Sequence, residues 1–372
     1  MHNILDVAHT LVRHIQTHYP DDIAIVAYYG SYAQGTATQR SDLDFFFISA
    51  TSRGYDASLQ FVLNDISFDF WPISWERAAR MAAFEETNTS IIADCKLLYV
   101  RSEEDRVRFL QLRDTIAEMP NHGLKLVERA ESHMRDIYAH VYNMTYNQHR
   151  DDMTLYRVDA HAVITKVLES LALLNRTYFT KGWGKNAEQY KNFAIRPARL
   201  EEAIDTIIHA QNCVEIRVAC EGLVHDTLEL LIEQKNTYSN GPSYPDRMRG
   251  FYEELKGIFD KLLTACEKKD YASAFFWSIG IQDELARFLY YSEKGHWPLT
   301  VEPNIVYQNH YFEAGLPNLI TLLNPDDYEP LQVAVEDLQC KLECHLRTRG
   351  VDIHRFSSIP DLEEFLTNRI PN

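Results

Sequence analysis

The spacing of apolar residues changes near Pro120, and the change predicts two kinds of architecture in one chain. Before Pro120, apolar runs of strand length stand at 23–30, at 42–49 and within 59–73. An amphipathic helix precedes them, marked by a stripe at helical spacing: Ile4, Ala8, Leu11, Val12 and Ile15. Ser74 precedes a further helical segment and is expected to be its N-cap. These patterns predict a mixed α/β domain, with a sheet flanked by helices.

After Pro120, strand-like alternation is scarce and long helical stretches dominate. We expect helices at 122–150, 155–178, 199–237, 246–268, 270–294 and 327–348. A loop rich in Ser, Gly and Pro at 239–246 is the expected internal seam of this part. The sequence therefore predicts an α/β N-terminal domain over 1–120, followed by an all-α helical-bundle region over 121–372.

One segment, GSYAQGTATQRSDLDFFF, places polar residues between two apolar runs. Gly30 and Ser31 follow a buried strand, where glycine permits a tight turn close to a ligand. A serine hydroxyl and exposed backbone amides at such a turn suit phosphate oxygens. Asp42 and Asp44 stand two residues apart at the start of the next strand, so their side chains share a face.

Asp69 supplies a third carboxylate on a later strand, between Phe68 and Phe70. If that strand lies beside 42–49, three carboxylates converge. Oxygen ligands without histidine or cysteine favour Mg²⁺ or Mn²⁺. Two divalent ions in such a site can activate a hydroxyl nucleophile and neutralise a triphosphate.

The pattern GS-x-A-x-G-x(5)-S-D-x-D, with a later Asp on a strand, resembles the polymerase-β-like nucleotidyltransferase superfamily. Within it, the chain is most similar to the minimal nucleotidyltransferases and to the aminoglycoside nucleotidyltransferases of the kanamycin-modifying type. The resemblance implies ATP or another NTP as co-substrate and Mg²⁺ or Mn²⁺ as cofactor. It implies that Gly30 and Ser31 hold the nucleotide phosphates. It also implies that Asp42, Asp44 and Asp69 bind metal, with Asp69 as an alternative activator of the acceptor hydroxyl.

The resemblance extends weakly into the helical region, through ESHMRDIYAHVYN at 131–143. It places Asp136 at the position of a general base that activates the acceptor. It places His140 where the kanamycin-type enzymes bring a lysine onto the triphosphate, and the charge of a histidine depends on pH. Glu128 and Glu131 lie on the same stretch and are alternatives for the base.

The same stretch supports a different hypothesis. Arg135 and His140 match the R-x(4)-H pattern of HEPN domains, which are commonly paired with minimal nucleotidyltransferases. Such a module would modify protein or RNA, or cleave RNA, in toxin or defence control. The pattern is short, and the acidic composition disfavours an RNA substrate.

A basic loop follows the second expected helix of the helical region. Lys181 and Lys185 lie in the glycine-bearing segment TKGWGKN at 180–186, after an Asn-Arg-x-Tyr stretch that related helical domains often carry. We expect these two lysines to face the triphosphate or the base of the nucleotide.

The composition narrows the class of partner. The 372 residues include 54 acidic and 37 basic side chains, a net charge of −17, which disfavours nucleic acid and leaves a cationic small acceptor open. The six cysteines form no CxxC pair, no apolar run is long enough for a membrane span, and the N-terminus does not resemble a signal peptide. We expect a cytoplasmic enzyme, with a homodimer as an open possibility.

Taken with the resemblance, these features predict a Mg²⁺-dependent nucleotidyltransferase. It would move AMP from ATP onto a hydroxyl of a small, aminoglycoside-like molecule and release pyrophosphate. By this resemblance it would act in antibiotic resistance.

Overall fold

The computed structural model describes residues 4–38, 41–182, 184–238 and 241–368. The chain divides into two compact units, Met1–Gln234 and Lys235–Asn372, which are described separately. The unit boundary lies just before the expected seam at 239–246, of which 239–240 fall outside the described residues. The domain bounds expected from the sequence, 1–120 and 121–372, stay predictions.

The first unit contains a mixed sheet of five strands in the order β3-β4-β2-β1-β5. Strands β2 and β4 run parallel, and every other neighbouring pair is antiparallel. The strands are β1 Ile23–Tyr29, β2 Leu43–Ser49, β3 Leu59–Leu63, β4 Ile66–Ile73 and β5 Lys96–Val100. The pairing of β2 with β4 is the one that the convergence of three carboxylates required.

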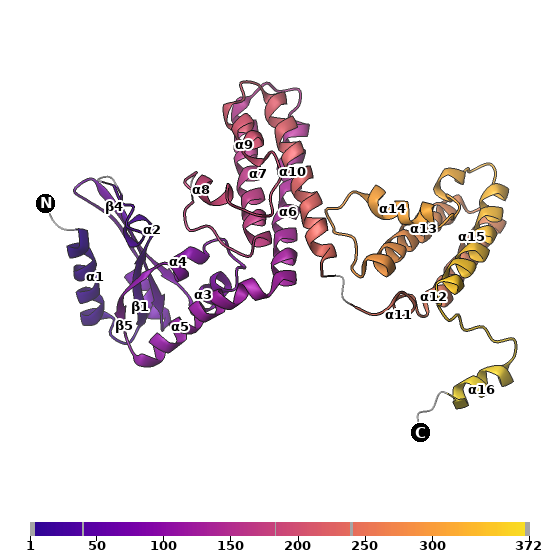
Figure 1. Cartoon of the computed structure of the whole chain (residues 1–372), viewed down its shortest axis with the longest axis horizontal. Helices are drawn as coiled ribbons and strands as arrows, with labels where there is room; N and C mark the ends of the chain where they lie inside the picture. Colours follow the sequence, from indigo (N-terminus) through magenta and orange to yellow (C-terminus); the bar gives the residue numbers. More distant parts are fainter. Residues whose placement is uncertain (1–3, 39–40, 183, 239–240, 369–372) are drawn as a thin grey trace. The chain divides into compact units, whose positions relative to one another are not determined.

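Alternation along the strands divides the sheet into two faces. Leu43, Phe45 and Phe47 of β2 join the buried cluster that α1 (Ile4–His18) completes. Asp44 and Phe46 therefore point to the opposite face. Figure 1 shows α1 on one side of the sheet and three other helices beyond its opposite side: α3 Trp75–Ala82, α4 Thr89–Ala93 and α5 Glu103–Glu118. The predicted N-cap of α3 is confirmed, since Ser74 Oγ accepts from Arg77 N at 3.0 Å.

The helical part of the first unit is built on a hairpin of two long helices, α6 (Gly123–Tyr146) and α7 (Met153–Leu174). Three helices follow: α8 Ala187–Tyr190, α9 Leu200–His209 and α10 Cys213–Asn236. The prediction of one helix over 199–237 is wrong. Ala210 leaves helical geometry with a ψ of 138°, and Asn212 restarts the helix by accepting from Glu215 N at 2.9 Å.

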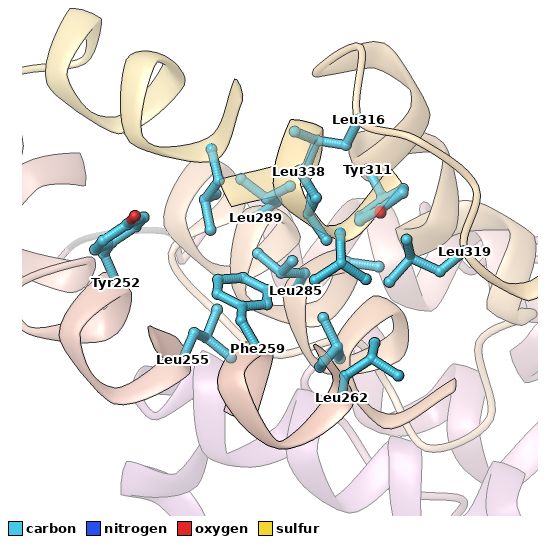
Figure 2. Close-up of a cluster of buried hydrophobic side chains, with 14 of the residues drawn as sticks. Tyr252, Leu255, Phe259, Leu262, Leu285, Leu289, Tyr311, Leu316, Leu319 and Leu338 are labelled. Atoms are coloured by element: carbon cyan, nitrogen blue, oxygen red, sulfur yellow. The ribbon is translucent and has the colours of Figure 1, made fainter. Parts of the chain in front are cut away.

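The second unit is a helical bundle with its own apolar core, shown in Figure 2. Its helices are α11 Tyr244–Arg247, α12 Phe251–Lys268, α13 Tyr271–Lys294, α14 Asn304–Glu313, α15 Glu329–Thr348 and α16 Ile359–Asn368. The helix expected from 246 begins only at Phe251, because Gly250 adopts a left-handed φ of 79°. Helices α14 and α16 lie outside the stretches that periodicity marked. No helix in the described ranges is long and apolar enough to cross a membrane.

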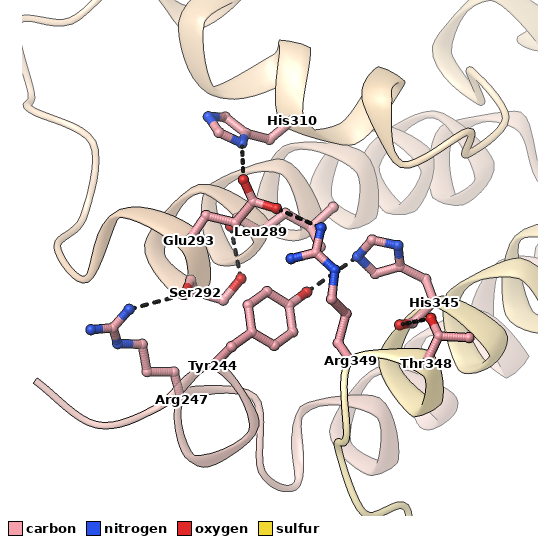
Figure 3. Close-up of polar contacts among 9 residues, drawn as sticks. All are labelled: Tyr244, Arg247, Leu289, Ser292, Glu293, His310, His345, Thr348 and Arg349. Carbon is pink, nitrogen blue, oxygen red and sulfur yellow. Dashed lines mark hydrogen bonds and ion pairs between the residues drawn. The ribbon is translucent and has the colours of Figure 1, made fainter.

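Polar contacts attach α11 to the bundle of the second unit (Figure 3). The Tyr244 hydroxyl lies 3.2 Å from His345 Nε2 on α15. Arg247 donates to the backbone oxygen of Ser292 on α13 at 2.9 Å. The short helix therefore belongs to the second unit.

Four short segments complete the architecture. They are α2 Gly30–Ala33 and the 3₁₀ turns Ser52–Ala57, Met119–Asn121 and Ile320–Leu322. The first of them carries the Gly-Ser motif and opens the candidate site.

Candidate active site

The Gly-Ser turn lies directly against one of the carboxylates. Strand β1 ends at Tyr29, and Gly30 follows with a left-handed φ of 69°. A Cβ at this position would lie 2.6 Å from Asp44 Oδ2, closer than a real carbon approaches an oxygen. Glycine adopts this backbone conformation without strain and leaves the Asp44 carboxylate where it is, whereas any larger residue would have to displace that carboxylate or the turn. The chain then curls back, with Thr36 N donating to Ser31 O at 2.9 Å.

Four residues lie side by side across four neighbouring strands. Tyr29 on β1 is in register with Asp44 on β2, and Asp44 with Asp69 on β4. Asp69 is in turn in register with Gln60 on the edge strand β3. We call these four residues the rung. Since residues in register on neighbouring strands point to one face, the rung places two carboxylates between two neutral polar side chains.

Asp42, just before strand β2, adds a third carboxylate close to the rung. It precedes Asp44 by two residues and is exposed, whereas Asp44 is half-buried. Burial, and then the charges of Asp42 and Asp69, raise the pKa of Asp44 from 3.8 to about 6. Within the described ranges, no salt bridge joins these carboxylates to a lysine or arginine. They therefore form an uncompensated cluster of oxygen ligands, which fits Mg²⁺ or Mn²⁺.

Both ends of the rung are held by hydrogen bonds. Gln60 Nε2 donates to Asp69 Oδ1 at 2.8 Å, and Trp71 Nε1 donates to the Tyr29 hydroxyl at 3.1 Å. Burial, together with the charge of Asp44, raises the pKa of Tyr29, which keeps this hydroxyl protonated. The sequence reading missed Gln60, Tyr29 and Trp71 as residues of the site.

A signal for Gln60 was present in the sequence. Asn64 and Asp65 are the two residues of the β3–β4 turn, both with positive φ, as a two-residue hairpin of this type requires. Such a turn fixes the register on both sides, and counting outward from it pairs Gln60 with Asp69.

The basic loop of the helical part approaches the Gly-Ser turn. Gln34, in the turn, donates its side-chain amide to the backbone oxygen of Thr180 at 2.5 Å. Lys181 is the next residue, half-exposed, with Nζ 4.0 Å from a carboxylate oxygen of Glu188. Lys185 is exposed. The residue between the two glycines of this loop, Trp183, lies outside the described residues.

The structure gives the candidate residues of α6 different neighbours. Asp136 is 64% exposed and lies 3.3 Å from Lys166 Nζ on α7. His140 Nδ1 lies 2.8 Å from Oδ1 of the buried Asp159, also on α7. The recorded contacts of Asp136 and His140 in the described chain are thus within the α6–α7 hairpin rather than with the rung. Their roles as base and phosphate ligand stay predictions.

The alternatives on α6 have equally distinct positions. Glu131, an alternative base, is buried at 9% exposure, whereas Glu128 is exposed. Arg135, the first residue of the R-x(4)-H pattern, lies on α6 just over one turn before His140. Arg135 and His140 both lie within residues 106–237, a segment that the next paragraph compares with a known family.

Comparison with known proteins identifies two segments. Residues 10–118 match the model of the nucleotidyltransferase domain, and residues 106–237 match that of the KNTase C-terminal domain. A comparison with curated proteins gives no match. Among solved structures, a nucleotidyltransferase-like protein from Exiguobacterium sibiricum 255-15 is similar, with 10% identity and a TM-score of 0.36. That match covers 67% of this chain and 87% of the other.

Proposed function

The chain belongs to the kanamycin nucleotidyltransferase-like family of the polymerase-β superfamily, and we propose that it adenylylates a hydroxyl group of a small polyhydroxylated acceptor. That it is a nucleotidyltransferase follows from its family. The observation that carries the proposal is the cluster of Asp42, Asp44 and Asp69 beside the Gly30 turn. ATP is the proposed donor because of the resemblance of the motif to the kanamycin-modifying enzymes.

Asp42, Asp44 and Asp69 are the residues that would hold divalent metal. Their oxygens are hard donors. Burial, and then the charges of Asp42 and Asp69, raise the pKa of Asp44, and a bound cation would offset the repulsion among the three carboxylates. When bound, Mg²⁺ or Mn²⁺ supplies charge neutralisation for the triphosphate and a more acidic acceptor hydroxyl. The protein's own contribution is to fix the carboxylates on neighbouring strands, so that no reorganisation is needed at the moment of transfer.

The Gly-Ser turn and the basic loop are the proposed binding elements for the phosphates. Ser31 and the backbone amides of the turn would donate hydrogen bonds to the oxygens of the β- and γ-phosphates. Gln34 in this turn donates a hydrogen bond to the backbone oxygen of Thr180, and Lys181 is the next residue. The backbone of Lys181 therefore lies near the turn, and its ammonium group is a proposed contact of the same phosphates. His140 and Lys185 are further proposed phosphate contacts.

The acceptor is proposed to be a cationic small molecule of the aminoglycoside kind. A net charge of −17 favours a cation, and Asp136 on the exposed side of α6 is the proposed general base. Both suggestions depend on the resemblance. A cytoplasmic location is part of the same proposal, and all six cysteines, which lie within the described residues, are free thiols.

A transfer assay tests the function. The protein is incubated with Mg²⁺, each of the four α-labelled NTPs in turn, and a panel of aminoglycosides and lincosamides. The proposal expects label on a small molecule with ATP as the best donor, and no transfer by Asp42→Asn or Asp44→Asn. Label on a protein or on RNA, or RNA cleavage that survives Asp44→Asn but not His140→Ala, would overturn it.

A further inference from the structure

Gln60 occupies a position that constrains Asp69 directly. It lies on the edge strand β3, exposed, and is the cross-strand partner of Asp69. Side chains in direct register stand about 4.5–5.5 Å apart at Cβ. The pairing of β3 with β4 therefore brings the Gln60 amide within hydrogen-bonding reach of the Asp69 carboxylate. The recorded hydrogen bond, from Nε2 to Asp69 Oδ1 at 2.8 Å, uses this proximity.

Asp69 needs such a partner more than Asp44 does. Asp44 is half-buried and Gly30 packs against its carboxylate, which limits the rotation of that side chain. Asp69 is exposed, with no comparable packing recorded in the described residues. A bond to Oδ1 fixes the orientation of its carboxylate and leaves Oδ2 as the second oxygen for a ligand on the face that Asp44 shares.

The amide is also the side chain whose charge suits this position. A lysine or arginine in register with Asp69 would pair with it and compete with a metal ion for the same oxygens. An aspartate or glutamate would add a further negative charge to a cluster of three carboxylates that already repel one another. Glutamine donates a hydrogen bond and adds no charge, which is the property that partners of metal ligands need.

We propose that Gln60 is a positioning residue, which orients Asp69 for divalent metal through the hydrogen bond to Oδ1. The inference depends on the proposed function, because it assumes that Asp69 is a metal ligand. It adds a residue on the edge strand β3 to the set that determines metal affinity.

The test measures Mn²⁺ binding by electron paramagnetic resonance, in the full chain with a non-hydrolysable ATP analogue. Gln60→Leu removes the hydrogen bond at nearly the same size, and Gln60→Lys places a competing cation at the position. Val62→Thr is the matched control, since Val62 shares the strand and the face of Gln60, is 70% exposed and pairs with Ser67. Unfolding temperature is measured on each variant.

Gln60→Leu is expected to weaken Mn²⁺ binding about 10- to 100-fold at an unchanged unfolding temperature. Gln60→Lys is expected to weaken it more, and Val62→Thr to bind as the wild type does. Wild-type affinity in Gln60→Leu, alongside lost binding in Asp44→Asn, would overturn the role of Gln60 and leave the proposed function standing. Absence of Mn²⁺ binding by the wild type would overturn both.

Discussion

Replacing Gly30 by alanine tests the packing of the Gly-Ser turn against Asp44. The added Cβ would stand 2.6 Å from Asp44 Oδ2, so the carboxylate must rotate or the turn must move away from β2. A non-glycine residue at a left-handed φ also costs roughly 1–2 kcal/mol. Displacing a reacting group by about 1 Å can cost on the order of 100-fold in rate, so we expect kcat to fall by that order.

Gly35→Ala separates the two effects. Gly35 has the same φ of 69°, but a Cβ there meets nothing within 4 Å. Both variants should therefore lose a similar 1–2 kcal/mol, or about 2–8 °C in unfolding temperature, from backbone strain. Only Gly30→Ala should also lose most of its kcat.

The measurement is steady-state pyrophosphate release with saturating NTP and Mg²⁺, paired with thermal unfolding of each variant. If Gly30→Ala kept its activity, or if both variants lost activity in proportion to stability, the close approach of the turn to Asp44 would be irrelevant to catalysis.

Three further substitutions follow from the site. Lys181→Met should raise the KM for NTP about tenfold with little change in kcat. Lys191→Met, which changes an exposed lysine at the C-terminal end of α8, should not, and equal effects would refute a specific phosphate contact. Asp136→Asn should lower kcat about 10²- to 10⁴-fold with unchanged NTP binding, and normal turnover would assign the base elsewhere. Because the folded pKa of Asp44 is raised from 3.8 to about 6, the metal-free protein should lose stability as pH rises between these values. Asp44→Asn should abolish that loss in urea unfolding, and an identical pH profile would contradict the raised pKa.

Short-range rules predicted the parts of the site that lie close together in sequence. The Gly30 turn and the N-cap at Ser74 each depend on a few neighbouring residues. Asp42 lies just before β2, and the face that it was expected to share with Asp44 stays a prediction. The position of Asp69 depended on whether β4 pairs with β2. That pairing joins segments that are distant in sequence, so the convergence of the three carboxylates could be stated only on the condition that the two strands are neighbours.

Short-range rules could not predict the residues that contribute to the site through tertiary contacts. Trp71 reaches Tyr29 across the sheet, and Gln34 reaches Thr180 in a loop 146 positions away. The hairpin turn at Asn64-Asp65 would have predicted the partner of Asp69, had its register been counted. On α6, an ungapped match located Asp136 and His140 in sequence, but their neighbours on α7 depend on helix packing, which periodicity does not specify.

The central claim is that Asp42, Asp44 and Asp69 form a metal-dependent site for nucleotidyl transfer to a small molecule. Mass spectrometry of the acceptor after incubation with ATP and Mg²⁺ tests it most directly, with wild type and Asp44→Asn side by side. We expect an acceptor heavier by one nucleotidyl group (a nucleoside monophosphate less one water) and an equal amount of pyrophosphate, both only with the wild type and only with divalent metal. The same product from Asp44→Asn, or transfer that persists in EDTA, would contradict it.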